Sequence, residues 1–149
     1  MTTLHSASFE AGALDNFSEN LRTDCRTVAS EIQRDAAVIL LDGDPPPYEL
    51  LISLRENALG LNFSGKELQI HFSPLKGIMS DYGLMIDAHG AALRHQAPYS
   101  RSEAIDMGRR AMHNEAAEIV LRELSPHLTA DIGTARLLFT LIFMLTQRR

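Results

Sequence analysis

Three short segments of the chain alternate apolar residues with other residues, and this period of two constrains the fold more than any other feature. Their apolar positions are Leu50, Ile52 and Leu54, then Leu59, Leu61 and Phe63, and then Leu68, Ile70 and Phe72. Such alternation is typical of β-strands that bury one face. Because only a few residues separate the segments, hairpin connections are favoured. The sequence therefore predicts a three-stranded antiparallel meander whose apolar face needs a cover.

The chain before the meander has weaker patterns. Residues 1–14 are small or polar and show no period, so we expect a flexible lead-in there. From Phe17 to Gln33, apolar residues recur at steps of three and four, which predicts an N-terminal helix. The length of the remaining chain, residues 15–149, corresponds to a single domain.

Three further helices are expected after the meander. Ser73-Pro74 predicts the start of the first, because serine caps helices and proline fits their first turn. The capping box at Ser100–Glu103 predicts a second helix that ends near Leu124, and Thr129 or Asp131 caps a third. We therefore predict an α+β fold in which an N-terminal helix, the meander and three packed helices follow one another, with the three helices on one face of the sheet.

Composition limits the classes of function. The chain has 19 acidic and 14 basic residues, a net charge of −5, whereas proteins that coat nucleic acid are usually basic. Nucleic-acid binding is therefore unexpected. The single cysteine, Cys25, cannot form an internal disulfide, which favours a reducing compartment. We recognise no secretory signal and no apolar run near the about 20 residues of a membrane span, so we expect a cytoplasmic protein without a membrane partner.

The predicted helix that ends near Leu124 carries the densest set of chemically active residues. Asp106 stands three residues before Arg109 and four before Arg110, a spacing that favours ion pairs along one helix. Apolar residues occupy most of its circumference, so we expect the helix to be covered on more than one side. Some of its charges should then be partly buried and must be paired. A structural ion-pair network is the favoured interpretation.

Two other interpretations remain open for the same residues. Arg109 and Arg110 would bind a phosphate or a carboxylate. His113 would transfer protons near neutral pH, tuned by Glu115 or Asp106. We recognise no metal-ligand spacing, nucleophile motif or phosphate-binding loop, so we predict no metal and no cofactor. A non-enzymatic role is favoured for the same reason.

The strings EAIDMGRRAMHNE at residues 103–115 and DIGTARLLFTLI at residues 131–142 resemble uncharacterised protein family 0262. The resemblance covers roughly residues 48–145, is stronger in the helical half, and implies one compact bacterial domain with no assigned activity. Members of that family tend to carry an aromatic pair where this chain has His89-Gly90, which implies a divergent member. By position, the resemblance marks Asp81, Asp106, Arg109, Arg110, His113, Asn114, Glu115, Asp131 and Arg136.

The last predicted helix is apolar on nearly all sides. Either this helix is central in the fold or a second chain covers it, and we predict a symmetric homodimer through Leu137, Phe139 and Phe143. The favoured function is a non-enzymatic interaction or regulatory module that acts as this homodimer, with an unidentified protein as a further possible partner.

Two alternative functions belong to other classes. One is a binder or enzyme for an anionic small molecule, with Arg109 and Arg110 as the anion clamp and His113 as the general acid–base. The other is an RNA- or ribosome-associated factor that uses Arg94, Arg101, Arg109 and Arg110 as a local basic patch despite the negative net charge.

Overall fold

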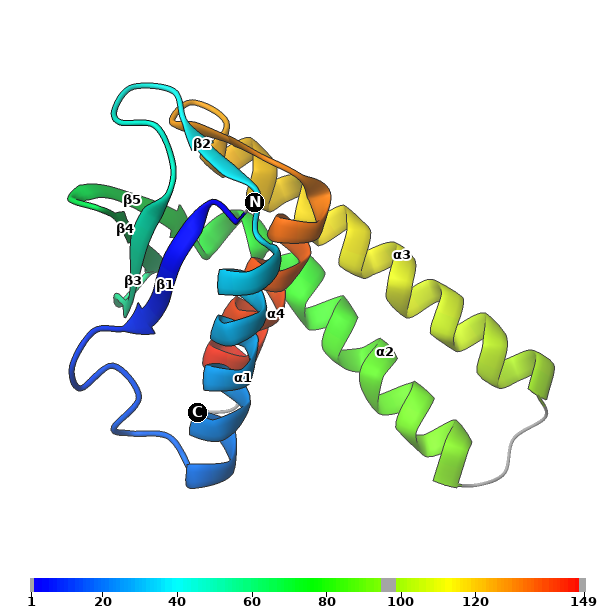
Figure 1. The fold of residues 1–149 in the computed structure, drawn as a ribbon. Helices are drawn as coiled ribbons and strands as arrows, with labels where there is room; N and C mark the ends of the chain where they lie inside the picture. The colour runs from blue at the N-terminus through cyan, green and yellow to red at the C-terminus, as the bar shows by residue number, and fades with distance from the viewer. Residues whose placement is uncertain (1, 95–98, 148–149) are drawn as a thin grey trace.

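The computed structural model describes residues 2–94 and 99–147, and it confirms the α+β class (Figure 1). The elements in chain order are β1 (Leu4–Phe9), α1 (Glu19–Asp35), β2 (Val38–Leu40), β3 (Tyr48–Leu54), β4 (Ala58–Phe63), β5 (Lys66–His71), a 3₁₀ turn (Ser73–Leu75), α2 (Lys76–Arg94), α3 (Tyr99–Leu124), β6 (Leu128–Ala130) and α4 (Ile132–Gln147).

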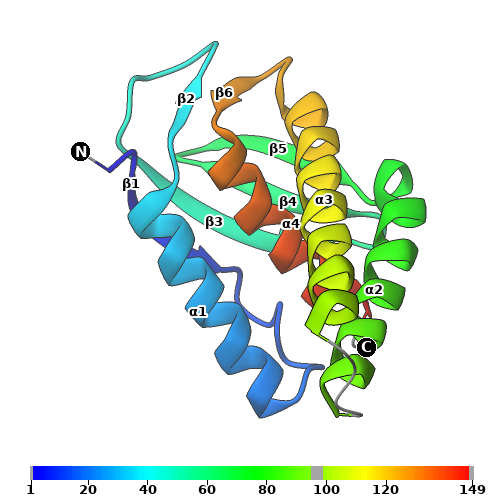
Figure 2. The same ribbon diagram turned by 90° about the vertical axis from the view of Figure 1, so that its right-hand side faces the viewer.

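The predicted meander is confirmed. Strands β3, β4 and β5 pair antiparallel, with Leu54 opposite Leu59 and Leu61 opposite Leu68. The alternating apolar residues point to the side where the helices lie and form the centre of the core. In Figure 2 the helices lie in front of the sheet, so one face is covered as the sequence indicates.

Strand β1 corrects the expectation of a flexible lead-in. It pairs parallel with β3 and becomes the edge of a four-stranded sheet of order β1-β3-β4-β5. The register shifts between Leu4 and Ser6, so a bulge at His5 puts Leu4 and Ala7 on one face although their spacing is odd. That bulge hides the period of two from the sequence. Gln33 of α1 donates a hydrogen bond of 2.9 Å to the His5 carbonyl.

The helix starts differ in part from the predictions. Helix α2 begins at Lys76 after the 3₁₀ turn, and no side chain caps that turn, so the expected cap at Ser73 is wrong. Helix α3 begins at Tyr99, one residue before the expected capping box, whose side chains lie outside the described residues. Helix α4 is capped by Asp131, as one of the two alternatives predicts.

Helix α4 is the central helix of the fold. It packs between α1 and α3, and its buried side is continuous with the core beneath the sheet. Helices α2 and α3 form an antiparallel hairpin whose far half extends beyond the sheet and beyond α1 and α4 (Figure 1). No helix among the described residues is both long enough and apolar enough to span a membrane.

A two-stranded sheet of β2 and β6, which the sequence analysis does not predict, joins the two halves of the chain. Next to it, the buried hydroxyl of Thr134 accepts a hydrogen bond from the Ala37 amide at 2.9 Å. The same hydroxyl donates to the Asp131 carboxylate at 2.6 Å, and the Thr134 amide donates to that carboxylate at 2.8 Å. One residue therefore ties the start of α4 to the end of α1.

Replacement of Thr134 by valine should destabilise the fold, because the isosteric side chain leaves the Ala37 amide without its partner. An unsatisfied buried donor costs about 1–3 kcal/mol. Urea unfolding followed by circular dichroism measures this free energy. Thr129→Val, at an exposed position of β6, is the matched control and should change it by less than about 0.5 kcal/mol. Equal losses in the two variants would contradict the role of Thr134.

Candidate functional site

Asp106, Arg109 and Arg110 of α3 form an ion-pair cluster on one side of the helix. Arg109 donates to Asp106 Oδ1 at 2.8 Å and 3.2 Å through Nη2 and Nε, and Arg110 Nη2 lies 2.6 Å from Asp106 Oδ2. The side chains of Asp106 and Arg109 are 25% and 30% exposed, whereas that of Arg110 is 63% exposed. The predicted pairing of partly buried charges therefore holds for Asp106 and Arg109, and Arg110 lies at the solvent edge.

The cluster perturbs its own ionisation. The hydrogen bond from Arg109 lowers the pKa of the Asp106 carboxyl, and the positive charges of Arg110 and Arg109 lower it further. In return, Asp106 raises the pKa of the Arg109 guanidinium above its ordinary value. Both arginines share one carboxylate, so their positive charge is partly neutralised within the helix.

His113 lies deeper, between α2 and α4. Its ring stacks on Tyr82 with centroids 5.5 Å apart and an interplanar angle of 24°, and it meets Phe139 at 5.5 Å. His113 Nε2 lies 3.0 Å from Thr140 Oγ1, and that hydroxyl also donates to the Arg136 carbonyl. Burial lowers the pKa of His113, and the positive charges of Arg136 and Arg109 lower it further. The imidazole is therefore neutral at pH 7 and serves as part of the packing.

The remaining predicted site residues are dispersed. Arg136 Nε donates to Asn114 Oδ1 at 2.6 Å, which links α4 to α3. Glu115 and Asp81 are exposed, and neither forms an ion pair among the described residues. The structure thus brings together Asp106, Arg109 and Arg110, places His113 beside them in the aromatic packing, and leaves Glu115 and Asp81 apart.

The apolar side chains of α4 find cover within the chain. Phe139, one of the three residues predicted at a dimer interface, is 0% exposed and contacts Tyr82, His113 and Phe143. Leu137 and Phe143 are partly buried and pack against the core. The fully buried ring of Phe139 has no surface to offer a partner, whereas Leu137 and Phe143 keep part of theirs, and the dimer through α4 stays a prediction.

Cys25 adds no reactive thiol to the site, and the described residues contain no cluster of metal ligands. Cys25 is fully buried in α1, and burial, with the charge of Asp24, raises the pKa of its thiol to about 11. The thiol is therefore protonated and is a packing group. Among residues 2–94 and 99–147, no three His, Cys, Asp or Glu side chains gather as metal ligands do.

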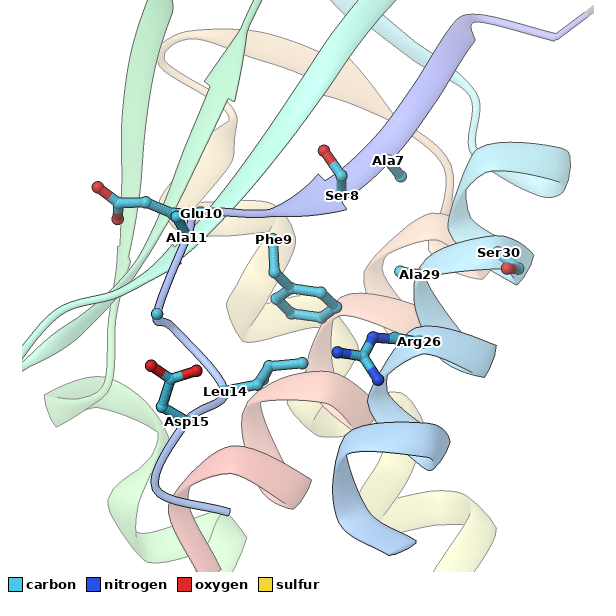
Figure 3. Close-up of a pocket in the computed structure, with 11 residues that line it drawn as sticks. Ala7, Ser8, Phe9, Glu10, Ala11, Leu14, Asp15, Arg26, Ala29 and Ser30 are labelled. Carbon is cyan, nitrogen blue, oxygen red and sulfur yellow. The ribbon is translucent and has the colours of Figure 1, made fainter. Parts of the chain in front are cut away.

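Two surface features were missed by the sequence analysis. Leu84 of α2 and Met107 of α3 are exposed. A hollow lies between β1, the loop that follows it and α1, with Arg26 directed into it (Figure 3). No short motif marks either feature, because each depends on segments that are distant in the sequence or on a strand whose pattern is hidden by a bulge.

Comparisons with known proteins place the chain in a family. The uncharacterised protein family UPF0262 matches residues 3–148, which is more of the chain than the resemblance at residues 48–145 covers. The chain belongs to the UPF0262 family. The family is bacterial and has no assigned activity, and no solved structure matches the chain.

Three relatives show the extent of the similarity. The chain is 39% identical over 106 residues to a UPF0262 protein of Phenylobacterium zucineum and 37% identical over 106 residues to one of Caulobacter vibrioides, and each alignment covers 68% of this chain. The chain spans 66% of the length of each of these two relatives. A UPF0262 protein of Azorhizobium caulinodans is 36% identical over 132 residues, which cover 76% of this chain and 81% of the relative.

The buried His113 should make the fold sensitive to acid. An unfolded histidine has a pKa of about 6.5, and the folded state lowers the value, so the unfolded state binds more protons below that pH. The neutral His113 therefore contributes its full stabilisation above about pH 6.5. Below that pH the free energy of unfolding falls as the pH drops, with a slope of at most about 1.4 kcal/mol per pH unit.

His113→Gln keeps a partner for Thr140 and cannot titrate, so the pH slope of its unfolding free energy between pH 7.5 and 5 should be shallower than that of the natural protein. His5→Gln, at an exposed position of β1, serves as the control and should keep the natural slope. Urea unfolding at each pH gives the comparison. Identical slopes for His113→Gln and the natural protein would show that His113 is not the responsible group.

Proposed function

We propose that the protein is a cytoplasmic, non-enzymatic interaction or regulatory module that forms a homodimer through one face of the α2–α3 hairpin. We call this face the hairpin outer face; its residues are Leu84, Ala88, Ala104, Met107 and Ala111, all of them exposed. The proposal keeps the self-association that the sequence suggests and moves it from α4 to the hairpin. The lone buried Cys25 supports a reducing compartment.

The exposure of two large apolar side chains carries the proposal. Leu84 is 66% exposed and Met107 60% exposed, the two highest values among the exposed large apolar residues of the described chain. They lie on the two antiparallel helices of one hairpin, which projects from the rest of the molecule (Figure 1). Exposed apolar residues that gather on one projecting element are typical of interaction surfaces.

The helical spacing places these residues on one side of the hairpin. On α2, Leu84 is two residues from Tyr82, which faces α3 and α4, so the two differ by about 160° around the helix. On α3, Gly108 faces Met85 of α2 and His113 faces α4, and Met107 lies about 100° or more from both. The outer face therefore points away from α4.

The relief of the outer face favours a second copy of the chain as its occupant. Leu84 and Met107 stand among three alanines, so large groups of one copy meet small groups of the other around a two-fold axis.

The alternative functions have less support. Arg109 and Arg110 already share the carboxylate of Asp106, and Nε2 of His113 is engaged by Thr140. A clamp for an anionic ligand would need to break these contacts. The basic patch for RNA contains the same neutralised arginines, and Arg101 lies among the side chains that the structure does not describe.

Charge placed on the outer face should disrupt the dimer. Sedimentation equilibrium at 5–100 µM should give a dimer for the natural chain, and the double variant Leu84→Glu with Met107→Glu should dissociate at least about tenfold more readily. The control is Ile39→Glu with Leu41→Glu, which adds the same charge at two exposed apolar residues outside the hairpin.

Two results would overturn the proposal. One is a natural chain that is monomeric up to 100 µM. The other is equal dissociation of the hairpin variant and the control, because the interface would then not lie on the hairpin outer face. Circular dichroism of all three proteins verifies that the substitutions leave the fold intact.

A further inference from the structure

We propose that the hollow between β1 and α1 binds a small carboxylate with one negative charge and an apolar body. The hollow has a volume of about 440 Å³, within the range of about 300–1,000 Å³ for small-molecule sites. Its walls come from the second half of β1, the loop at residues 10–15 and the middle of α1 (Figure 3). It lies away from the α2–α3 hairpin and is independent of the homodimer proposed above.

Arg26 supplies the charge that a ligand would need. Its guanidinium is directed into the hollow, toward the side chains of Phe9 and Leu14 (Figure 3). Within the described part of the chain it forms no ion pair and no side-chain hydrogen bond. A planar guanidinium presents two parallel N–H groups, which match the two oxygens of a carboxylate.

Apolar side chains form the floor of the hollow. Phe9 and Ala7 point to the inner side of the sheet, as their register with Ile52 and Leu50 of β3 requires. Leu14 and Ala29 are buried and line the same space from the loop and from α1. A hydrocarbon chain or ring of the ligand would cover this floor and remove it from water.

The acidic residues of the wall select the charge of the ligand. Glu10 is directed to Arg55, at 3.6 Å, and so has a partner outside the hollow. The carboxylate of Asp15 lies over the backbone of Gly12, which has a positive φ of 84°. With Glu10 paired to Arg55, Asp15 and Arg26 are the charged groups left on the wall, and beside the Asp15 carboxylate a doubly charged phosphate meets more repulsion than a singly charged carboxylate does. The preferred ligand is therefore an amphipathic monocarboxylate.

Three probes separate the two parts of this recognition. Hexanoate carries both the charge and the apolar body, acetate carries only the charge, and hexan-1-ol carries only the body. Titration of the isotopically labelled protein, followed by NMR shifts of the Ala7, Gly12 and Ala29 amides, measures the binding. We expect hexanoate to bind at least tenfold more tightly than either of the other two probes.

The variant Arg26→Gln should weaken hexanoate binding at least tenfold and leave the weak binding of hexan-1-ol unchanged. Arg34→Gln is the matched control, because Arg34 is an exposed arginine of the same helix that pairs with Asp35 outside the hollow. It should bind hexanoate like the natural chain. The double variant Leu84→Glu with Met107→Glu should also bind normally, so failure of the homodimer leaves this test intact.

Three outcomes would overturn the proposal. Hexanoate that causes no saturable shift up to 20 mM would show that the hollow binds no such ligand. Equal affinity for Arg26→Gln and the natural chain would show that Arg26 does not hold the carboxylate. Shifts confined to residues outside the hollow would place the binding elsewhere.

Discussion

Four rings hold the helical half of the molecule together. Tyr82 of α2 lies 5.5 Å from His113 of α3, 5.4 Å from Phe139 and 5.0 Å from Phe143 of α4, measured between centroids. Edge-to-face and stacked contacts of this kind add about 0.5–1.5 kcal/mol per pair to the burial of the rings. Helices α2 and α3 meet the central α4 at this joint, and their far ends extend past α4 (Figure 1). The direction in which the hairpin extends therefore depends on it.

This joint explains why polar residues stand in the middle of an apolar contact. A neutral His113 packs as an aromatic ring and still satisfies Thr140, whereas a charged ring would lose hydration and would face the positive charges of Arg136 and Arg109. Arg109 and Asp106 close the solvent side of the same contact with an ion pair. The string that identifies the family in the sequence is thus, in the fold, largely the part of α3 that meets α2 and α4.

Local patterns predict the elements whose stabilising contacts are close in the sequence. The meander is an example, because its strands pair with their immediate neighbours and its apolar face repeats every second residue. The pairs of Asp106 with Arg109 and Arg110, and the cap at Asp131, follow from spacings of three and four residues. Each of these contacts is completed within one helix or one hairpin.

Features that depend on distant segments are not visible in this way. Strand β1 is held by β3, more than forty residues later, and its bulge breaks the only local signal. The sheet of β2 and β6 joins residues about ninety positions apart. The apolar surface of α4 shows that the helix needs cover, but only the packing of α1, α2 and α3 around it shows that the cover is internal. The hollow beside Arg26 is not visible in the sequence either, because its walls come from separate segments and one of them is the strand β1, whose pattern the bulge breaks.

The bulge at His5 also affects how the sheet ends. Strand β1 is an edge, and an edge strand offers unpaired amides and carbonyls to which another chain can add a strand. Here the bulge interrupts the regular ladder, and Gln33 already occupies the carbonyl of His5. Strand addition at this edge would have to displace that side chain and straighten the backbone. The β1 edge of the sheet is thereby protected from the addition of a strand by another chain.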